Sequence, residues 1–119
     1  MPTILFANRY SEMHHITRLL EMYKLRFATV ERRSNNNLRV IDSFDKGEVD
    51  ILVGTDNISR GINLQRPRRV INWAPPFSLA DYLNRIGRCG RLNHSNIAHI
   101  YTFIRYTFYK IQLLATLIM

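Results

Sequence analysis

The chain has 119 residues, enough for one small domain with a hydrophobic core and too few for a second core of similar size. Its 17 lysines and arginines against 9 acidic residues give a net charge of +8, which favours a polyanion such as nucleic acid or nucleotide phosphates over an acidic protein as partner. A single cysteine excludes an internal disulfide, and no apolar segment is long enough to span a bilayer. We therefore expect a soluble intracellular protein, cytoplasmic or nuclear, without a membrane partner.

Short apolar runs typical of buried strands alternate along the chain with segments of helical periodicity. The sequence predicts strands at residues 4–7, 27–30, 50–54, 69–73 and 98–104. Helices are expected after Ser11, from about residue 38 to a stop near Gly47, and from Ser78 onward. This alternation predicts an α/β fold with a mostly parallel sheet, in which ligands gather at the carboxyl ends of the strands.

The tail, residues 106–119, is the most apolar stretch of the chain. Its apolar residues recur at helical spacing, and Lys110 and Gln112 interrupt them. We interpret the tail as a helix that docks on the domain, with membrane association as the weaker alternative.

The segment from Asn84 to Arg91 contains three arginines and two glycines in eight residues. Arginine presents a planar fork that matches phosphate oxygens, and glycine allows close backbone approach, so the segment is typical of a phosphate site. Ser78 is the expected N-cap of the preceding helix, with Asp81 as its acidic partner. Helical spacing places Leu79, Tyr82, Leu83 and Ile86 on a buried arc, and Asp81, Asn84, Arg85 and Arg88 on the opposite arc. An ordinary solvated basic face is the alternative.

A second candidate site, residues 54–63, follows the clearest predicted strand. Thr55 and Asp56 can cap a helical turn whose free N–H groups favour a phosphate, and Arg60 adds a positive charge. The alternative is an ordinary cap between a strand and a helix.

Together, these two segments resemble motifs V and VI of DEAD-box RNA helicases: Thr-Asp-x-x-x-Arg-Gly-Ile from Thr55, and Tyr-Leu-Asn-Arg-Ile-Gly-Arg-x-Gly-Arg from Tyr82. Residues 4–8 look like motif IV, and residues 44–47 are similar to the helix end before motif V. The resemblance implies a C-terminal RecA-like helicase lobe over residues 1–104, without its leading strand and helix. The implied fold is a three-layer sandwich, and residues 105–119 would form an additional apolar helix or tail.

The resemblance also implies roles at a nucleotide site. Arg88 and Arg91 would be the catalytic arginine fingers, which stabilise the charge that phosphoryl transfer builds on the triphosphate. Arg60, Asn63 and Arg85 would contact or organise the nucleotide, and Arg85 would tie its motif to the opposite lobe. The remaining contacts with that lobe would come from Asn84 and Asp56.

For RNA, the resemblance implies contacts to the backbone by Gly54 and Thr55, and by Asn8 and Arg9 as weaker candidates. Arg39 would stand for the arginine of a further RNA-binding element. Contacts to phosphate and ribose tolerate any sequence and weaken with salt. A count without gaps back from Phe44 gives the alternative pair for that element, Ser34 and Asn37.

The chain departs from the family pattern at three positions near the nucleotide: Asn84 replaces a histidine, Asn63 an aspartate and Ala74 another aspartate. No two glycines have the spacing of a P-loop, and no Asp-Glu-Ala-Asp segment occurs. ATP, with its Mg²⁺, is therefore expected on a separate N-terminal RecA-like lobe, in cis or in trans. The isolated chain is predicted to be inactive, and its histidines have no metal-ligand spacing.

The predicted function is that of the C-terminal lobe of an ATP-dependent RNA helicase, which supplies arginine fingers to ATP on the other lobe and holds RNA without sequence preference. The alternative is a non-catalytic RNA- or protein-binding module derived from such a helicase, which Asn63 and Asn84 suggest. A partner-docking or misfolding-prone remnant is the third hypothesis.

Overall fold

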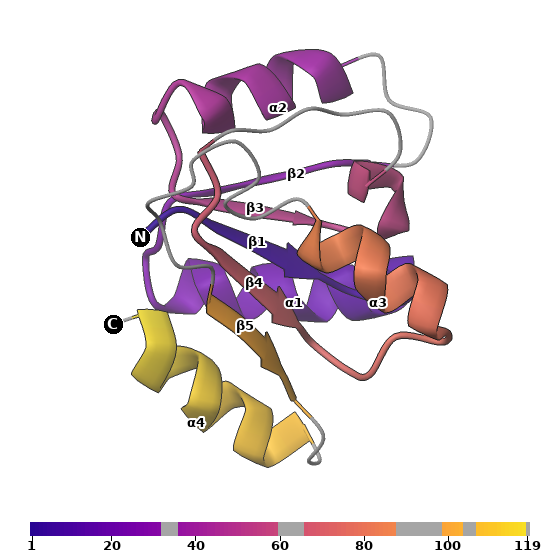
Figure 1. Ribbon diagram of the computed structural model, residues 1–119. Coiled ribbons are helices and arrows are strands. Elements are labelled where there is room, and N and C mark those ends of the chain that lie inside the picture. Colours follow the sequence, from indigo (N-terminus) through magenta and orange to yellow (C-terminus); the bar gives the residue numbers. More distant parts are fainter. Residues whose placement is uncertain (32–35, 60–65, 88–98, 104–106, 119) are drawn as a thin grey trace.

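The computed structural model describes residues 1–31, 36–59, 66–87, 99–103 and 107–118. Within these ranges, five strands form one parallel sheet in the order β2-β3-β1-β4-β5 (Figure 1). The predicted α/β fold with a parallel sheet is confirmed. The strands are β1 (Thr3–Phe6), β2 (Phe27–Thr29), β3 (Ile51–Gly54), β4 (Arg69–Asn72) and β5 (His99–Thr102).

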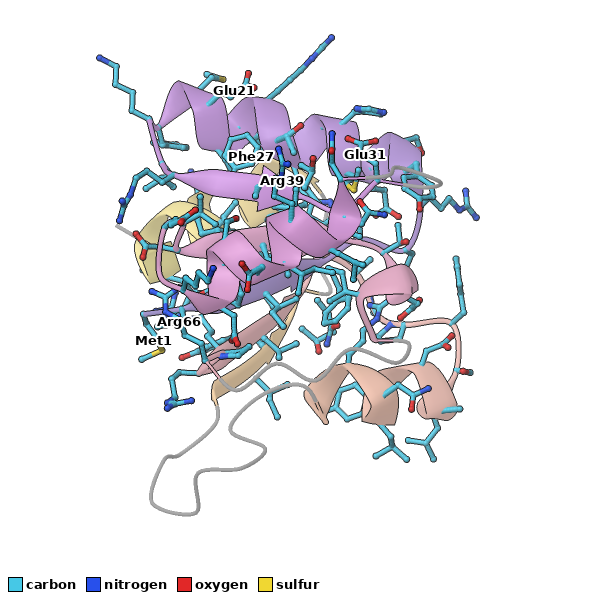
Figure 2. All side chains as sticks on the ribbon, turned by 90° about the horizontal axis from the view of Figure 1, so that it is seen from above. Met1, Glu21, Phe27, Glu31, Arg39 and Arg66 are labelled. Carbon is cyan, nitrogen blue, oxygen red and sulfur yellow. The ribbon has the colours of Figure 1, made fainter. Side chains whose placement is uncertain are left out.

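Helices cover both faces of this sheet. Helices α1 and α4 pack on one face, whereas α2 and the short 3₁₀ helix η1 pack on the other. Helix α3 contacts η1, and Figure 2 shows α1 and α3 on opposite sides of the sheet. The helices are α1 (Tyr10–Met22), α2 (Asn37–Asp45), η1 (Asp56–Ser59), α3 (Leu79–Ile86) and α4 (Thr107–Ile118).

The central strands are buried on both faces of the sheet. Their successive side chains point to opposite faces and therefore enter different cores. On β1, Leu5 packs in the core under α1, whereas Ile4 and Phe6 pack in the core under α2 and η1, and none of the three is exposed. Strands buried on both sides have continuous apolar sequences, which explains why the sequence located them well.

Helix α4 docks on the sheet, as the sequence predicted for the tail. Leu114 is buried in the same core as α1, and the Lys110 ammonium lies 5.5 Å from the centre of the Trp73 ring. A guanidinium N–H of Arg69 donates to the Leu117 carbonyl at 2.8 Å. None of the helices in the described ranges has the length and apolar character needed to cross a membrane.

Arg66 anchors the end of α2 to the chain that enters β4 (Figure 2). Its Nη1 donates to the carbonyls of Phe44 at 2.7 Å and Val49 at 2.9 Å, and its guanidinium lies 5.5 Å from the Phe44 ring centre. Asp50 forms ion pairs with Arg66 at 3.4 Å and with Arg26 at 2.9 Å. These contacts fix the loops at the amino ends of the strands.

The ion pairs of Asp50 predict a small dependence of stability on pH. The hydrogen bond from Arg26 holds the pKa of the Asp50 carboxyl below its ordinary 3.8, and Arg66 adds to this effect. Because the folded-state pKa is lowered, the stabilisation is present above the ordinary pKa and is lost as pH falls through the folded-state pKa. The Asp50 side chain is 45% exposed, so solvent screening keeps the contribution below about 1 kcal/mol.

We therefore expect Asp50→Asn to lower the free energy of unfolding slightly at neutral pH. Urea titrations at a series of pH values should show the variant and the parent converging as the pH drops below 3.8, the ordinary pKa. A difference that stays constant over the whole acid range would contradict the ion-pair origin.

Candidate functional site

The carboxyl ends of the central strands lie level with one another. Phe6 is the register partner of Gly54 on β3 and of Asn72 on β4, and Asn72 is the partner of Thr102 on β5. The residues that follow these strand ends therefore share one edge of the sheet, which we call the carboxyl edge. This is the edge at which parallel sheets with helices on both faces bind ligands.

A fully buried arginine, Arg85 of α3, organises the carboxyl edge. Its Nε and Nη2 donate to the two carboxylate oxygens of Asp56, at 2.7 and 2.9 Å. Its Nη1 donates to Asn72 Oδ1 at 3.1 Å, and its Nη2 also donates to Asn8 Oδ1 at 2.7 Å. The guanidinium lies 5.1 Å from the Phe6 ring centre. We call these five residues the Arg85 cluster.

The Arg85 cluster joins segments that are far apart in sequence. Asn8 follows β1, Asp56 follows β3, Asn72 ends β4, and Arg85 lies on α3. The amide groups extend the network, because Asn8 Nδ2 donates to the Pro75 carbonyl at 2.9 Å and Asn72 Nδ2 donates to Thr102 Oγ1 at 3.1 Å. The cluster therefore joins one described residue from each of the predicted motifs IV, V and VI, namely Asn8, Asp56 and Arg85.

The orientation of α3 differs from the sequence prediction. Its N-cap is as expected, since the Asp81 N–H donates to Ser78 Oγ at 3.1 Å. However, Leu79 and Leu83 are 71% and 52% exposed and Arg85 is 0% exposed, so the prediction is wrong at these three positions, whereas Asn84 is exposed as predicted. The four hydrogen bonds from Arg85 to Asp56, Asn72 and Asn8 explain its burial, because they satisfy and compensate the charge inside the protein.

Three residues with predicted roles toward the nucleotide or the other lobe lie near one another on the carboxyl edge. Arg85 and Asp56 pair within this lobe, with the Asp56 side chain 27% exposed. Asn84, the neighbour of Arg85 on α3, is exposed. Contacts of these three residues with a nucleotide or a second lobe stay predictions.

The residues with predicted RNA contacts are divided between exposed and enclosed positions. Arg9 and Arg39 are exposed, Asn8 is half-buried, and Gly54 and Thr55 are buried. Both polar atoms of the Asn8 side chain bind within the lobe. The described structure thus leaves Arg9 and Arg39 as the most accessible of the five, and their RNA contacts stay predictions.

The start of α2 brings Arg39 to the carboxyl edge. Asn37 exchanges two hydrogen bonds with the backbone of Glu31 beyond β2: Glu31 N–H donates to Asn37 Oδ1 at 2.9 Å, and Asn37 Nδ2 donates to the Glu31 carbonyl at 2.6 Å. Arg39 is two residues further along α2. Asn37, part of the alternative pair for this RNA element, is therefore occupied by a local contact, and Ser34, the other member, lies outside the described residues.

Four predicted site residues lie outside the described ranges. They include both predicted arginine fingers and the two predicted nucleotide contacts of motif V: Arg88, Arg91, Arg60 and Asn63. The ranges that the structure does describe contain no group of three or more metal-ligating side chains.

Gly54 is required for packing at the end of β3. A β-carbon there would lie 2.5 Å from Ile58 Cδ1, 2.7 Å from Ile58 Cγ1 and 3.3 Å from Val30 Cβ. Ile58 is fully buried, so it has little space into which to move. Helix η1 can therefore approach β3 this closely only because Gly54 has no side chain.

We expect Gly54→Ala to reduce the free energy of unfolding by about 2 kcal/mol, as overpacking in a filled core does. In an Ile58→Ala background, where the clashing atoms are removed, the same exchange should cost much less. Urea denaturation of the two single variants and the double variant measures this coupling. Additive effects would contradict the predicted clash.

Sequence reasoning missed two members of the Arg85 cluster, Phe6 and Asn72. Phe6 looks like any other apolar residue of a buried strand, so nothing in the sequence marks it. Asn72 did carry a signal, because a polar side chain inside the run Val70-Ile71-Asn72-Trp73 must find a hydrogen-bond partner when it is buried.

Comparison with known proteins defines the class. The family described as helicase conserved C-terminal domain matches residues 1–93, and the chain belongs to this family. More narrowly, it is a DEAD-box helicase C-terminal lobe, as the resemblance of its motifs V and VI predicted.

Two relatives illustrate the similarity. DEAD-box ATP-dependent RNA helicase 1 from Oryza sativa subsp. japonica is 31% identical over 107 residues, covering 86% of this chain and 20% of the relative. ATP-dependent RNA helicase RhlB from Erwinia tasmaniensis is 36% identical over 91 residues, covering 75% of this chain and 21% of the relative. The chain thus spans about a fifth of the length of these relatives.

A solved structure shows the same fold. The C-terminal domain of the DEAD-box protein Dbp5 aligns with a TM-score of 0.70 at 22% identity, covering 99% of this chain and 72% of that chain. The predicted RecA-like architecture is confirmed by this likeness and by the parallel sheet.

Proposed function

We propose that this chain acts as one half of an ATP-dependent RNA helicase, closing onto ATP that a separate N-terminal lobe binds. Similar proteins are named ATP-dependent RNA helicases, which supports both ATP and RNA as ligands. The observation that supports the proposal is the Arg85 cluster, because it brings Asn8, Asp56 and Arg85, one residue from each of three predicted helicase motifs, together on one edge of the sheet.

The proposed role in catalysis is electrostatic. Phosphoryl transfer places negative charge on the oxygens of the transferred group and on the leaving oxygen, and a positioned guanidinium stabilises that charge. Arg88 and Arg91 follow α3 by two and five residues, and α3 is held by the buried Arg85. The cluster would thus fix the helix from which the chain continues to Arg88 and Arg91. Mg²⁺ and the P-loop would come from the other lobe.

In the proposed role toward RNA, the chain binds the phosphate and ribose backbone of the RNA strand. Arg39 and Arg9 are exposed, and Thr55 and Asn8 follow neighbouring strand ends. Charged contacts to phosphates give binding that is independent of sequence and that weakens with salt. RNA held on the carboxyl edge would couple its binding to closure of the two lobes.

The decisive experiment is reconstitution. The chain is mixed with, or fused to, a DEAD-box N-terminal lobe that contains a P-loop, and RNA-stimulated ATP hydrolysis is compared with that of the N-terminal lobe alone. We expect stimulation by the parent chain and none by a variant with Arg88→Ala and Arg91→Ala. If the parent gives no stimulation while still binding RNA without nucleotide dependence, the non-catalytic alternative replaces this proposal.

A further inference from the structure

Phe77 belongs to none of the predicted sites, yet its aromatic side chain is 67% exposed at the carboxyl edge. The guanidinium of Arg9, itself exposed, lies 5.8 Å from the centre of the Phe77 ring. We propose that Phe77 and Arg9 form a stacking site for one unpaired nucleobase of the bound RNA strand. This inference rests on the proposed function, because it requires that RNA lies along this edge.

Both side chains come from fixed backbone. Arg9 is the N-cap residue of α1, and Asn8 before it bonds to Arg85 and to the Pro75 carbonyl. Phe77 stands between the pair Pro75-Pro76 and the Ser78 cap of α3, so proline rings restrict the backbone before it and a helix restricts the backbone after it. An aromatic ring held in this way is presented to solvent at little cost in conformational entropy.

The chemistry of the pair matches a nucleobase. Bases stack on exposed aromatic rings whatever their identity, because every base has a π-face. The Arg9 guanidinium, which lies over this ring, can pair with the phosphate that adjoins the stacked base. The net charge of +8 favours the same polyanion. Contacts to phosphate and ribose need no base, whereas stacking does, so the site would make part of the RNA affinity depend on a base. It would introduce no sequence preference, because any base can stack.

A protein partner is the competing occupant, because Leu79 and Leu83 are also exposed near Phe77 on the chain. Three apolar side chains fall well short of the roughly 800 Å² per partner that a stable protein interface buries. A single base needs only one ring and its neighbouring cation. The pairing of Arg9 with Phe77 therefore favours the nucleobase.

The test uses the full chain and single-stranded oligouridine, with binding followed by fluorescence anisotropy. Phe77→Ala should weaken binding about tenfold, and Phe77→Trp should retain it. Leu79→Ala, at a similarly exposed apolar position of α3, is the matched control and should bind like the parent. On a strand of abasic ribose phosphates, the parent and Phe77→Ala should bind equally, and thermal unfolding by circular dichroism checks that each variant is folded.

A second readout is fluorescence. Trp73 is the only tryptophan of the chain and is 2% exposed, so Phe77→Trp introduces an exposed fluorophore against a buried background. Oligouridine should quench the new signal, and the abasic strand should not.

The outcomes separate this inference from the proposed function. If the parent binds RNA with the expected salt dependence but Phe77→Ala binds equally well, the stacking site is refuted and the proposed function stands. A loss of affinity that is equally large on the abasic strand also refutes stacking. If Phe77→Ala and Leu79→Ala leave RNA binding intact but weaken stimulation of an N-terminal lobe, the surface contacts protein and the inference is overturned. If the parent fails to bind RNA even at low salt, both the inference and the proposed function fail.

Discussion

Replacing Arg85 with methionine is expected to lower the free energy of unfolding by about 3 kcal/mol or more. The exchange leaves the Asp56 carboxylate and the side-chain oxygens of Asn72 and Asn8 without their charged donor. Removing the buried guanidinium is costly because the Asp56 carboxylate, only 27% exposed, stays partly desolvated and loses its opposite charge. Urea denaturation of the purified chain measures the change.

Matched variants isolate the cause. Arg18→Met makes the same exchange at an exposed position of α1 and should change stability little. Arg85→Lys should fall between parent and methionine variant, because an ammonium cannot reproduce the paired contacts with the Asp56 carboxylate. Combining Arg85→Met with Asp56→Leu should recover part of the loss. A methionine variant as stable as Arg18→Met would show that the cluster contributes nothing.

Replacing Arg88 with alanine is expected to lower the ATPase rate of the two-lobe assembly by about a thousandfold. A finger acts on charge that develops only in the transition state, so the loss should fall on kcat, and the affinity for ATP should change little. Steady-state kinetics with saturating RNA separates these quantities.

The control for Arg88 is Arg18→Ala, which removes a guanidinium of equal charge from an exposed position of α1. Its rate should stay within a factor of about two of the parent rate, since a single surface charge acts weakly through screened solvent. The condition is that the parent chain stimulates ATP hydrolysis by the N-terminal lobe. If Arg88→Ala then lowers the ATPase rate less than tenfold, the assignment of Arg88 as a finger is contradicted and Arg91 is left as the candidate.

The sequence predicted the sheet well because its central strands are buried on both faces. Leu52 and Val53 of β3 sit in different cores, and each must be apolar. The N-cap at Ser78 was also predictable, because a hydroxyl before a helical pattern satisfies a free N–H locally. Features decided by neighbouring residues along the chain were thus accessible without the structure.

The orientation of α3 was not predictable in the same way. Periodicity shows which residues share an arc, but tertiary partners decide which arc is buried. Arg85 is drawn inward by Asp56, Asn72 and Asn8, which lie between 13 and 77 residues away in sequence. The exposed Leu79 and Leu83 follow from that choice, since a helix that buries an arginine must turn other side chains outward.

The Arg85 cluster also has a consequence for sequence divergence. Its guanidinium is shared by side chains from three other segments, so a change at Asn8, Asp56 or Asn72 alters the surroundings of all the others. These four positions should diversify as a set, whereas Leu79 and Phe77 are free to vary singly as far as folding is concerned. Substitutions on the exposed face of α3 can therefore create new binding properties without disturbing the Arg85 cluster, which holds this helix in place.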